Sequence, residues 1–311
     1  MTSGADSQGS QGWLAQYYTD AKTPEGTRGA GRDSDPALGG LSVRPPDKYV
    51  AAKPIGSGGM KEVLRVRDKD AGRDVALALP RAKGGESRRY RRFVREGRIT
   101  AALEHPNIVP IHDVGVDDSG RPYFTMRLLG GQTLEDILNK LRSGDGETLE
   151  EFTLHRLLDI LLHVCRAIAF AHARGVVHRD LKPANIQVGD YGEVHVIDWG
   201  LAKVRDSAIV DVDAEQDKVL AESLDRTLDG VLKGSPGYMA PEQVDRRIGD
   251  IDERSDIYAL GGLLYSVLTH KPPVRGRTLQ QVLHNTRSGK VVPPHRRSGN
   301  QASRQRSKRS R

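Results

Sequence analysis

The pattern of hydrophobic and polar positions predicts both strands and helices. Apolar residues alternate with polar ones, or run between turn residues, in three short segments that we predict to be β-strands: 63–67, 75–79 and 123–126. Three longer segments have helical character, and they are 88–103, 153–173 and the strongly apolar segment from 255 to about 269. The chain is therefore expected to mix α and β structure.

Both ends of the chain lack this periodicity. Residues 1–47 are rich in Gly, Ser and Asp, which predicts a disordered arm. Residues 290–311 contain eight Lys or Arg and no acidic residue, so they account for the formal net charge of +7. We predict a basic disordered tail at 291–311. Such a tail attracts nucleic acid or anionic lipid only through its charge, so no specific nucleic-acid partner is expected.

Composition narrows the class of protein. The 311 residues provide about two domains' worth of core. The single cysteine, Cys165, excludes an internal disulfide and lies in an apolar helical segment, which favours a core thiol. Residues 1–12 lack the apolar core of a secretion signal, and the longest apolar stretch, 257–268, is too short to span a bilayer. We therefore expect a cytoplasmic protein without a transmembrane segment.

The most informative motif lies in the middle of the chain. It reads His178-Arg179-Asp180-Leu181-Lys182-Pro183-Ala184-Asn185, and Asp198-Trp199-Gly200 begins thirteen residues after Asn185. Phosphoryl transfer needs a group that accepts the hydroxyl proton, groups that hold metal, and positive charge against the phosphates. The two aspartates, the lysine and the asparagine of these motifs can supply these groups.

These motifs resemble those of the eukaryotic-like serine/threonine protein kinases of bacteria. The resemblance implies an α+β, bilobed protein-kinase-like fold in residues 48–290, with a small β-rich N-lobe (48–129) and a larger helical C-lobe (130–290). It also implies ATP and Mg²⁺ as cofactors. Asp180 would accept the proton of the substrate hydroxyl, Lys182 would steady the γ-phosphoryl group, and Asn185 and Asp198 would hold the metal.

The resemblance extends to a nucleotide-binding region. A glycine-rich run matches the loop that covers the phosphates, and Glu96 matches the family's helix-borne glutamate. Met126 matches the residue behind the adenine. The implied nucleotide-binding set is Ile55, Gly56, Ser57, Gly58, Gly59, Met60, Lys61, Val63, Ala76, Met126, Leu128 and Asp198.

One position departs from the family. The lysine expected in the second predicted strand is Ala78, while Lys61 replaces the third glycine of the glycine-rich run. The with-no-lysine kinases make the same exchange. We therefore predict that Lys61 pairs with Glu96 and the nucleotide; Lys83 is a weaker substitute because it follows Pro80 in a predicted loop. The alternative is a pseudokinase that acts as a nucleotide-binding or scaffolding module.

The substrate and its regulation are indicated in part. Lys182, the segment 234–242 and Asp256 favour a protein substrate with a serine or threonine hydroxyl over a small molecule such as an aminoglycoside. Arg179 would pair with a phosphate on the activation segment, for which the candidates are Ser207, Ser223 and, above all, Thr227. Ser235 matches the family's threonine that contacts Asp180 and Lys182.

A second departure concerns the C-terminus. In the family, further helices follow the segment that matches 277–287, and they supply an arginine to the glutamate that matches Glu242. The residues after this segment have no apolar periodicity with which to build them. We therefore predict that the terminal helices are missing and that Glu242 lacks its arginine partner. Three explanations are open: a natural truncation, a frameshifted gene product, or a subunit whose C-lobe is completed by a partner protein.

Overall fold

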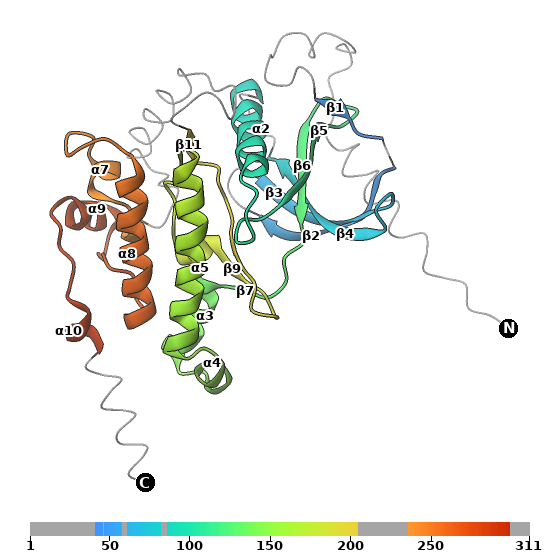
Figure 1. Ribbon diagram of the computed structural model, residues 1–311. Coiled ribbons are helices and arrows are strands. Elements are labelled where there is room, and N and C mark those ends of the chain that lie inside the picture. Colours follow the sequence, from blue (N-terminus) through green and yellow to red (C-terminus); the bar gives the residue numbers. More distant parts are fainter. Residues whose placement is uncertain (1–40, 46, 58–60, 82–85, 205–235, 299–311) are drawn as a thin grey trace. The chain divides into compact units, whose positions relative to one another are not determined.

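The computed structural model (Figure 1) describes residues 41–45, 47–57, 61–81, 86–204 and 236–298. The chain forms two compact units. Unit 1 comprises Met1–Ala102 and Pro110–Leu129, and unit 2 comprises Leu103–Val109 and Gly130–Arg311. Unit 1 ends at Leu129 and unit 2 resumes at Gly130, and the boundaries of the predicted lobes stay predictions.

The segment 103–109 belongs to unit 2, although the sequence placed it in the N-lobe. The ring of His105 lies 5.0 Å from that of Phe170, and Asn107 donates a hydrogen bond of 2.9 Å to the carbonyl of Val194. These contacts hold the segment against a helix and a strand of unit 2.

Unit 1 contains a six-stranded sheet with one helix beside it (Figure 1). Its strands follow the spatial order β1-β5-β6-β4-β3-β2, and all neighbours are antiparallel except β1 and β5. Their bounds are β1 Ser42–Val43, β2 Tyr49–Ser57, β3 Lys61–Asp68, β4 Arg73–Pro80, β5 Ile111–Val116 and β6 Pro122–Arg127, and the helix is α2, Glu86–Ala102. The strands and the helix predicted in this region are present.

The central strand β4 is buried on both faces. Its residues from Val75 to Pro80 are almost inaccessible, whereas β3 alternates buried and exposed positions over its second half. On one face Val75 and Leu77 join a cluster with Tyr49 and Tyr123. On the other face Ala78 packs with aromatic rings of α2 and β6. A strand between two apolar layers has a continuous run of hydrophobic residues in its sequence, as β4 does.

Part of the predicted N-terminal arm is ordered. Strand β1 pairs with β5, and the backbone N–H of Arg44 donates 2.9 Å to the carbonyl of Val116. The Arg44 side chain is buried, with its guanidinium 5.2 Å from the ring centroid of Tyr123 and 5.8 Å from that of Tyr49. Burial against aromatic faces gives these residues a defined place despite their polar sequence.

Unit 2 is mainly helical. Its helices are α3 Leu134–Ser143, α4 Gly146–Glu151, α5 Leu154–Ala173, α7 Pro241–Val244, α8 Glu253–Thr269, α9 Leu279–Arg287 and α10 Pro294–Ser298. Helices α5 and α8 lie side by side and pack together (Figure 1). The short strands and turns are β7 Gln132–Thr133, β8 Val176–Val177, η1 Pro183–Asn185, β9 Ile186–Val188, β10 Val194–Val196, β11 Lys203–Val204 and η3 Pro236–Tyr238.

Side-chain caps explain where three of these helices begin. The Thr133 side chain and Asp136 form a capping box at α3. At α5 the Thr153 side chain accepts a hydrogen bond from the backbone N–H of Arg156. Asp252 caps α8, so this helix begins at Glu253, two residues before the predicted start. Helix α3 ends at Gly144, whose φ of 84° lies in the left-handed region that favours glycine.

The segment after residue 290 includes helical structure. Helix α10 lies inside the predicted tail and packs against α8, and the Tyr265 hydroxyl donates 2.7 Å to the carbonyl of Val292. This part of the predicted tail is therefore helical, whereas residues 299–311 lie outside the described residues. Within the described ranges, no helix combines the length and the apolar character needed to cross a bilayer.

Candidate active site

Three side chains of the predicted catalytic loop meet in unit 2. The Lys182 Nζ lies 2.6 Å from Asp180 Oδ2, and the Asn185 amide Nδ2 donates to the Asp180 carbonyl oxygen at 2.8 Å and to Oδ2 at 3.2 Å. Pro183 begins the turn η1, which returns Asn185 towards Asp180. The short spacing between these residues and this turn together create the cluster.

Asp180 is largely withdrawn from solvent, since 14% of its side chain is exposed. Burial raises the pKa of its carboxyl, while the charge of Lys182 and the hydrogen bond from it act in the opposite direction. A carboxylate with a raised pKa is a better proton acceptor than an exposed one. The geometry therefore suits a base that receives a hydroxyl proton.

His178 supports the backbone of the catalytic loop. The side chain is fully buried, and burial lowers the pKa of its imidazole, so the ring is neutral at pH 7. The Asp180 N–H donates to His178 Nδ1 at 3.2 Å, which leaves the ring proton on Nε2, 3.4 Å from the Ile197 carbonyl. Trp199 packs on this ring with a centroid separation of 4.6 Å.

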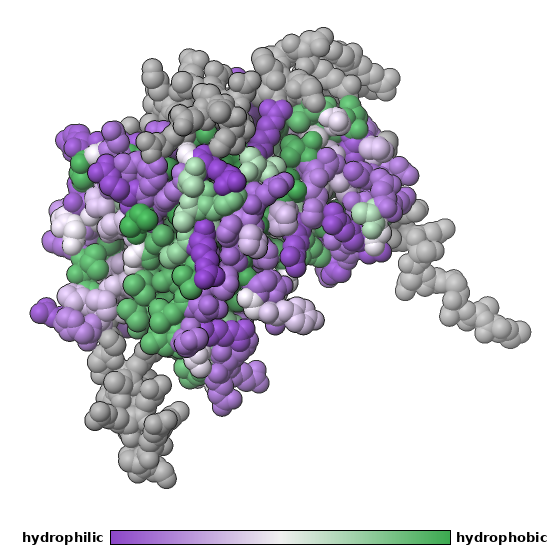
Figure 2. All heavy atoms as spheres, in the orientation of Figure 1, coloured by the Kyte–Doolittle hydropathy of each residue, from purple (hydrophilic) through white to green (hydrophobic). Residues whose placement is uncertain are grey.

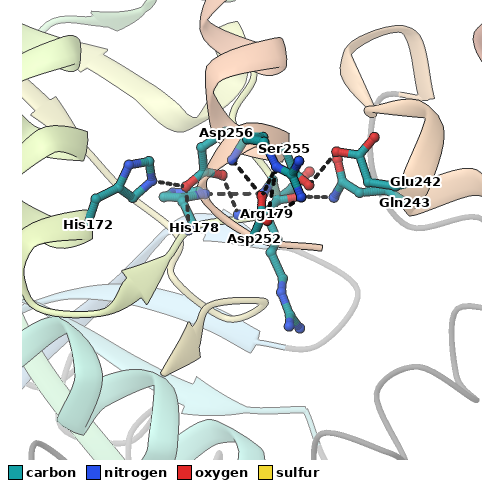
Figure 3. Close-up of polar contacts among 10 residues, drawn as sticks. His172, His178, Arg179, Glu242, Gln243, Asp252, Ser255 and Asp256 are labelled. Atoms are coloured by element: carbon teal, nitrogen blue, oxygen red, sulfur yellow. Dashed lines mark hydrogen bonds and ion pairs between the residues drawn. The ribbon is translucent and has the colours of Figure 1, made fainter. Parts of the chain in front are cut away.

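Asp256 holds the start of the catalytic loop from helix α8 (Figure 3). Its carboxylate accepts hydrogen bonds from the backbone N–H groups of His178 and Arg179 and from His172 Nε2, each at 2.8 Å. The side chain is 1% exposed, so these hydrogen bonds replace water around a buried charge. This arrangement fixes the backbone directly before Asp180.

Two residues of the site adopt a backbone conformation that side chains rarely tolerate. Arg179 has a φ of 69° and Asp198 a φ of 67°, both in the left-handed region. The Gln243 side chain donates 2.7 Å to the Arg179 carbonyl and accepts from the Ala240 N–H (Figure 3). Surrounding hydrogen bonds therefore hold the strained backbone at Arg179, as is common at functional sites.

Glu242 has a hydrogen-bond partner other than the expected arginine. The Ser255 hydroxyl donates 2.6 Å to Glu242 Oε1 (Figure 3), and Glu242 itself is half-buried. The Glu242 carboxylate thus accepts a hydrogen bond, while the absence of the family's arginine partner stays a prediction. A half-buried carboxylate keeps contact with water, so one hydroxyl and solvent together satisfy it.

In unit 1, the Lys61 ammonium contacts the Glu96 carboxylate of α2. The register of the sheet explains this contact. Val63 lies opposite Ala78, and Lys61 lies two residues before Val63, so the side chains of Lys61 and Ala78 point from the same face of the sheet. The Lys61 Nζ lies 5.9 Å from the ring centroid of Phe124, which packs with Ala78 on that face. A lysine on β3 thus reaches the glutamate that a lysine at position 78 would face.

The other nucleotide-binding candidates in the described part of unit 1 differ in exposure. Ala76 is buried, whereas Val63, Met126 and Leu128 are half-buried. Ile55 is 48% exposed. Several predictions fall outside the described residues, and they concern Gly58, Gly59, Met60, Lys83, Ser207, Ser223, Thr227 and Ser235.

The predicted metal ligands are suited to a hard cation. Asn185 uses its Nδ2 within the catalytic loop, so its side-chain oxygen remains as a ligand atom, and Asp198 adds a half-buried carboxylate. In the described ranges, no group of three or more His, Cys, Asp or Glu side chains is placed to hold a metal ion. Mg²⁺ is commonly held by one or two protein oxygens together with substrate phosphates, so these two residues fit it.

Sequence reasoning missed three residues of the polar network. No role was predicted for His172, Gln243 or Ser255, yet each bonds to a residue of the network in Figure 3. Only their places in the sequence, directly beside Glu242 and Asp256, could have drawn attention to Gln243 and Ser255.

The fold and this site define a class of protein. Residues 49–309 match the family model of the protein kinase domain, and the chain belongs to that family. Serine/threonine-protein kinase PknD of Protochlamydia amoebophila is 38% identical over 245 residues, which cover 77% of this chain and 25% of that protein. The protein of the same name from Chlamydia felis is 34% identical over 80% of this chain. The one from Chlamydia trachomatis serovar D is 38% identical over 79% of this chain. In both cases the match covers 27% of the relative.

The chain spans about a quarter of the length of the curated relatives it matches. These relatives are named serine/threonine-protein kinases, so the pseudokinase alternative gains no support from them.

Proposed function

We propose that the chain is a serine/threonine protein kinase domain that transfers the γ-phosphoryl group of ATP to a protein hydroxyl, with autophosphorylation. The observation that carries this proposal is the cluster of Asp180, Lys182 and Asn185. Asp180 orients the substrate hydroxyl and accepts its proton as the bond to phosphorus forms and the bond to ADP breaks. Lys182 supplies positive charge to the transferring group.

The roles of two further groups belong to the same proposal. Lys61, fixed by Glu96, neutralises charge on the nucleotide phosphates in place of the lysine that position 78 lacks. Asn185 and Asp198 hold Mg²⁺, which supplies additional positive charge to the phosphates when it is bound. Arg179, Thr227 and Ser235 stay candidates for regulation by phosphorylation.

The test is transfer from labelled ATP to a generic protein acceptor. Replacing the base in Asp180→Asn should lower the rate by about 10²- to 10⁴-fold. Lys61→Met should lower it by about 10²- to 10³-fold, because one preorganised positive charge is lost. Lys83→Met and Lys53→Met serve as matched controls, the latter being an exposed lysine of unit 1, and both should keep the wild-type rate.

The outcome separates the two candidate functions. Loss of activity with Lys61→Met but not with Lys83→Met supports a displaced lysine. A folded wild-type protein that binds ATP without transferring phosphate would instead establish the pseudokinase. A cytoplasmic location is part of the proposal, because a free cysteine such as Cys165 fits a reducing compartment.

The proposal also includes a partner protein that covers part of unit 2. Its support is a set of leucines on α5 and α8 with 39% to 52% of their surface exposed: Leu154, Leu158, Leu162, Leu264 and Leu268. Contiguous exposed apolar side chains of this kind commonly mark protein contacts.

A further inference from the structure

Unit 2 contains a pocket of about 500 Å³ beside the catalytic loop. Residues of α3, the turn η3, the end of α8, the segment 270–276 and α9 line it. Several of the lining residues are buried, among them Pro183, Tyr238 and Val274. None of the side chains assigned above to transfer of the phosphoryl group lines this pocket.

The wall of the pocket carries an excess of positive charge. Its lining includes three cationic side chains, Arg142, Lys271 and Arg275, and a single carboxylate, Glu135. Two of these charges, on Arg142 and Lys271, act on the pKa of His270, which also lines the pocket. This pKa is lowered first by burial and then by the charges of Arg142 and Lys271, so the imidazole is neutral at pH 7.

The frame around these charges is well defined. The Asn285 side chain donates 2.8 Å to the Arg275 carbonyl, and the Asn139 side chain accepts 2.8 Å from Arg142. Among the lining residues, the hydroxyls of Tyr238 and Ser266 are 2.9 Å apart. Ligand pockets commonly combine apolar lining residues with a few polar groups that fix the orientation of the ligand.

We propose that this pocket binds an acidic side chain of the protein substrate, so that substrates with carboxylates near the phosphorylated hydroxyl are preferred. This inference rests on the proposed function. Pro183 lines the pocket and follows Asp180 by three residues, which span at most about 11 Å. An extended substrate peptide would therefore place an acidic residue in the pocket about three to six positions from its acceptor serine.

The experiment uses synthetic peptides with one acceptor serine. Glu, Gln or Lys is placed three to six positions before or after that serine. Both kcat/KM and the Kd of the fluorescently labelled peptide, from anisotropy, are measured. The wild-type chain should favour the best Glu peptide over its Gln counterpart by about tenfold, mainly through KM, and the preference should weaken with added salt.

Charge reversal tests the pocket itself. The double variant Arg142→Glu/Lys271→Glu should lose the preference for Glu over Gln and gain a preference for Lys over Gln. Lys140→Glu is the matched control, since Lys140 is exposed on the same helix and does not line the pocket. This control variant should behave like the wild type.

The outcomes are distinguishable. Equal binding of Glu and Gln peptides by the wild type overturns the pocket assignment, even if both peptides are phosphorylated. Tighter binding of Glu peptides without any transfer supports the pocket and refutes the proposed function. The other candidate ligand of the pocket is the acidic run 211–217 of this chain. If neutralising Asp211, Asp213, Glu215 and Asp217 changes peptide binding while reversal of the pocket charges does not, the substrate assignment is wrong.

Discussion

At Asp180, burial and a neighbouring cation act on the pKa in opposite directions. Burial raises it and is the larger influence, while Lys182 lowers it through charge and a hydrogen bond. A base must be deprotonated to accept a proton. Activity is therefore lost as the pH falls through a pKa that lies above the ordinary value of 3.8.

The balance at Asp180 predicts the effect of a single substitution. Lys182→Met removes the group that lowers the pKa, so the acid limb of kcat/KM should move to higher pH, and the maximal rate should fall by about 10²- to 10³-fold. The measurement is kcat/KM against pH for both proteins, with circular dichroism in each buffer to establish that they are folded. An acid limb at unchanged or lower pH would show that Asp180 is not the titrating base. The neutral, buried His178 is not expected to contribute to this limb.

Asp256 illustrates the energetic cost of a buried acceptor. Asp256→Ala leaves two backbone N–H groups and His172 without their acceptor. Each buried donor left without an acceptor costs about 1–3 kcal/mol. We expect a loss of about 3–5 kcal/mol in the free energy of unfolding, measured with urea. Asp252→Ala is the control in the same helix. It removes an N-cap, which should cost about 1 kcal/mol. Equal losses in the two variants would contradict a special role for Asp256.

At the scale of elements, β3 and β4 determine where a lysine can reach Glu96. Positions 61 and 78 share one face of the sheet. Ala78 is fully buried and packs with Phe93 and Phe124, so a larger side chain there must displace apolar neighbours. The small Ala78 on β4 therefore leaves room for the apolar neighbours, while the long side chain of Lys61 on β3 reaches Glu96.

This arrangement predicts a partial rescue. The double variant Lys61→Ala/Ala78→Lys should transfer phosphate faster than Lys61→Ala alone, by about tenfold, because a lysine at position 78 faces Glu96. Its stability should fall by about 1–3 kcal/mol through overpacking. The control Lys61→Ala/Ala78→Met adds similar bulk without charge and should show no rescue. If both double variants are equally inactive, the lysine cannot be moved between these strands.

Element by element, the hydrophobic pattern was a good guide for several elements with a buried face, although it did not predict α3, which buries four apolar side chains. It predicted β3, β4, β6, α2, α5 and α8 within a few residues, since burial imposes the periods of strand and helix. It did not predict β1, because two exposed residues paired at a sheet edge carry no pattern. Helix α10 was missed for the same reason, since its sequence is polar and short.

The candidate site was predictable as far as its motifs reach. The residues of the catalytic loop and the contact of Lys61 with Glu96 could be stated from sequence, because motif spacing and resemblance specify them. The hydrogen bonds of Gln243 and Ser255, and the cationic pocket, could not, because they depend on how α7, α8 and α9 pack. Roles in catalysis and regulation stay predictions.

At the scale of the whole molecule, unit 2 has a cluster of exposed apolar side chains on its surface. Figure 2 shows hydrophobic side chains gathered over α5 and the lower part of α8. Leu154, Leu158 and Leu162 follow one another at intervals of four residues, so they form a stripe along one side of α5. With Leu264 and Leu268 they make an apolar surface on two adjacent helices, all five with 39% or more of their area exposed.

A second copy of the chain is one candidate for the partner that covers this surface, and it predicts concentration-dependent association of the chain. Burial of a leucine side chain contributes about 1.5–3 kcal/mol, so the variant Leu158→Gln/Leu162→Gln should weaken self-association by at least about tenfold. Sedimentation velocity over a range of concentrations measures the effect. Ile248→Gln is the matched control, because Ile248 is 50% exposed and lies in the segment between α7 and α8, apart from the stripe on α5. A wild-type chain that stays monomeric at 100 times the working concentration of a kinase assay would show that this surface does not bind its own copy. Equal weakening by both substitutions would show that general hydrophobicity, rather than the α5–α8 surface, drives association.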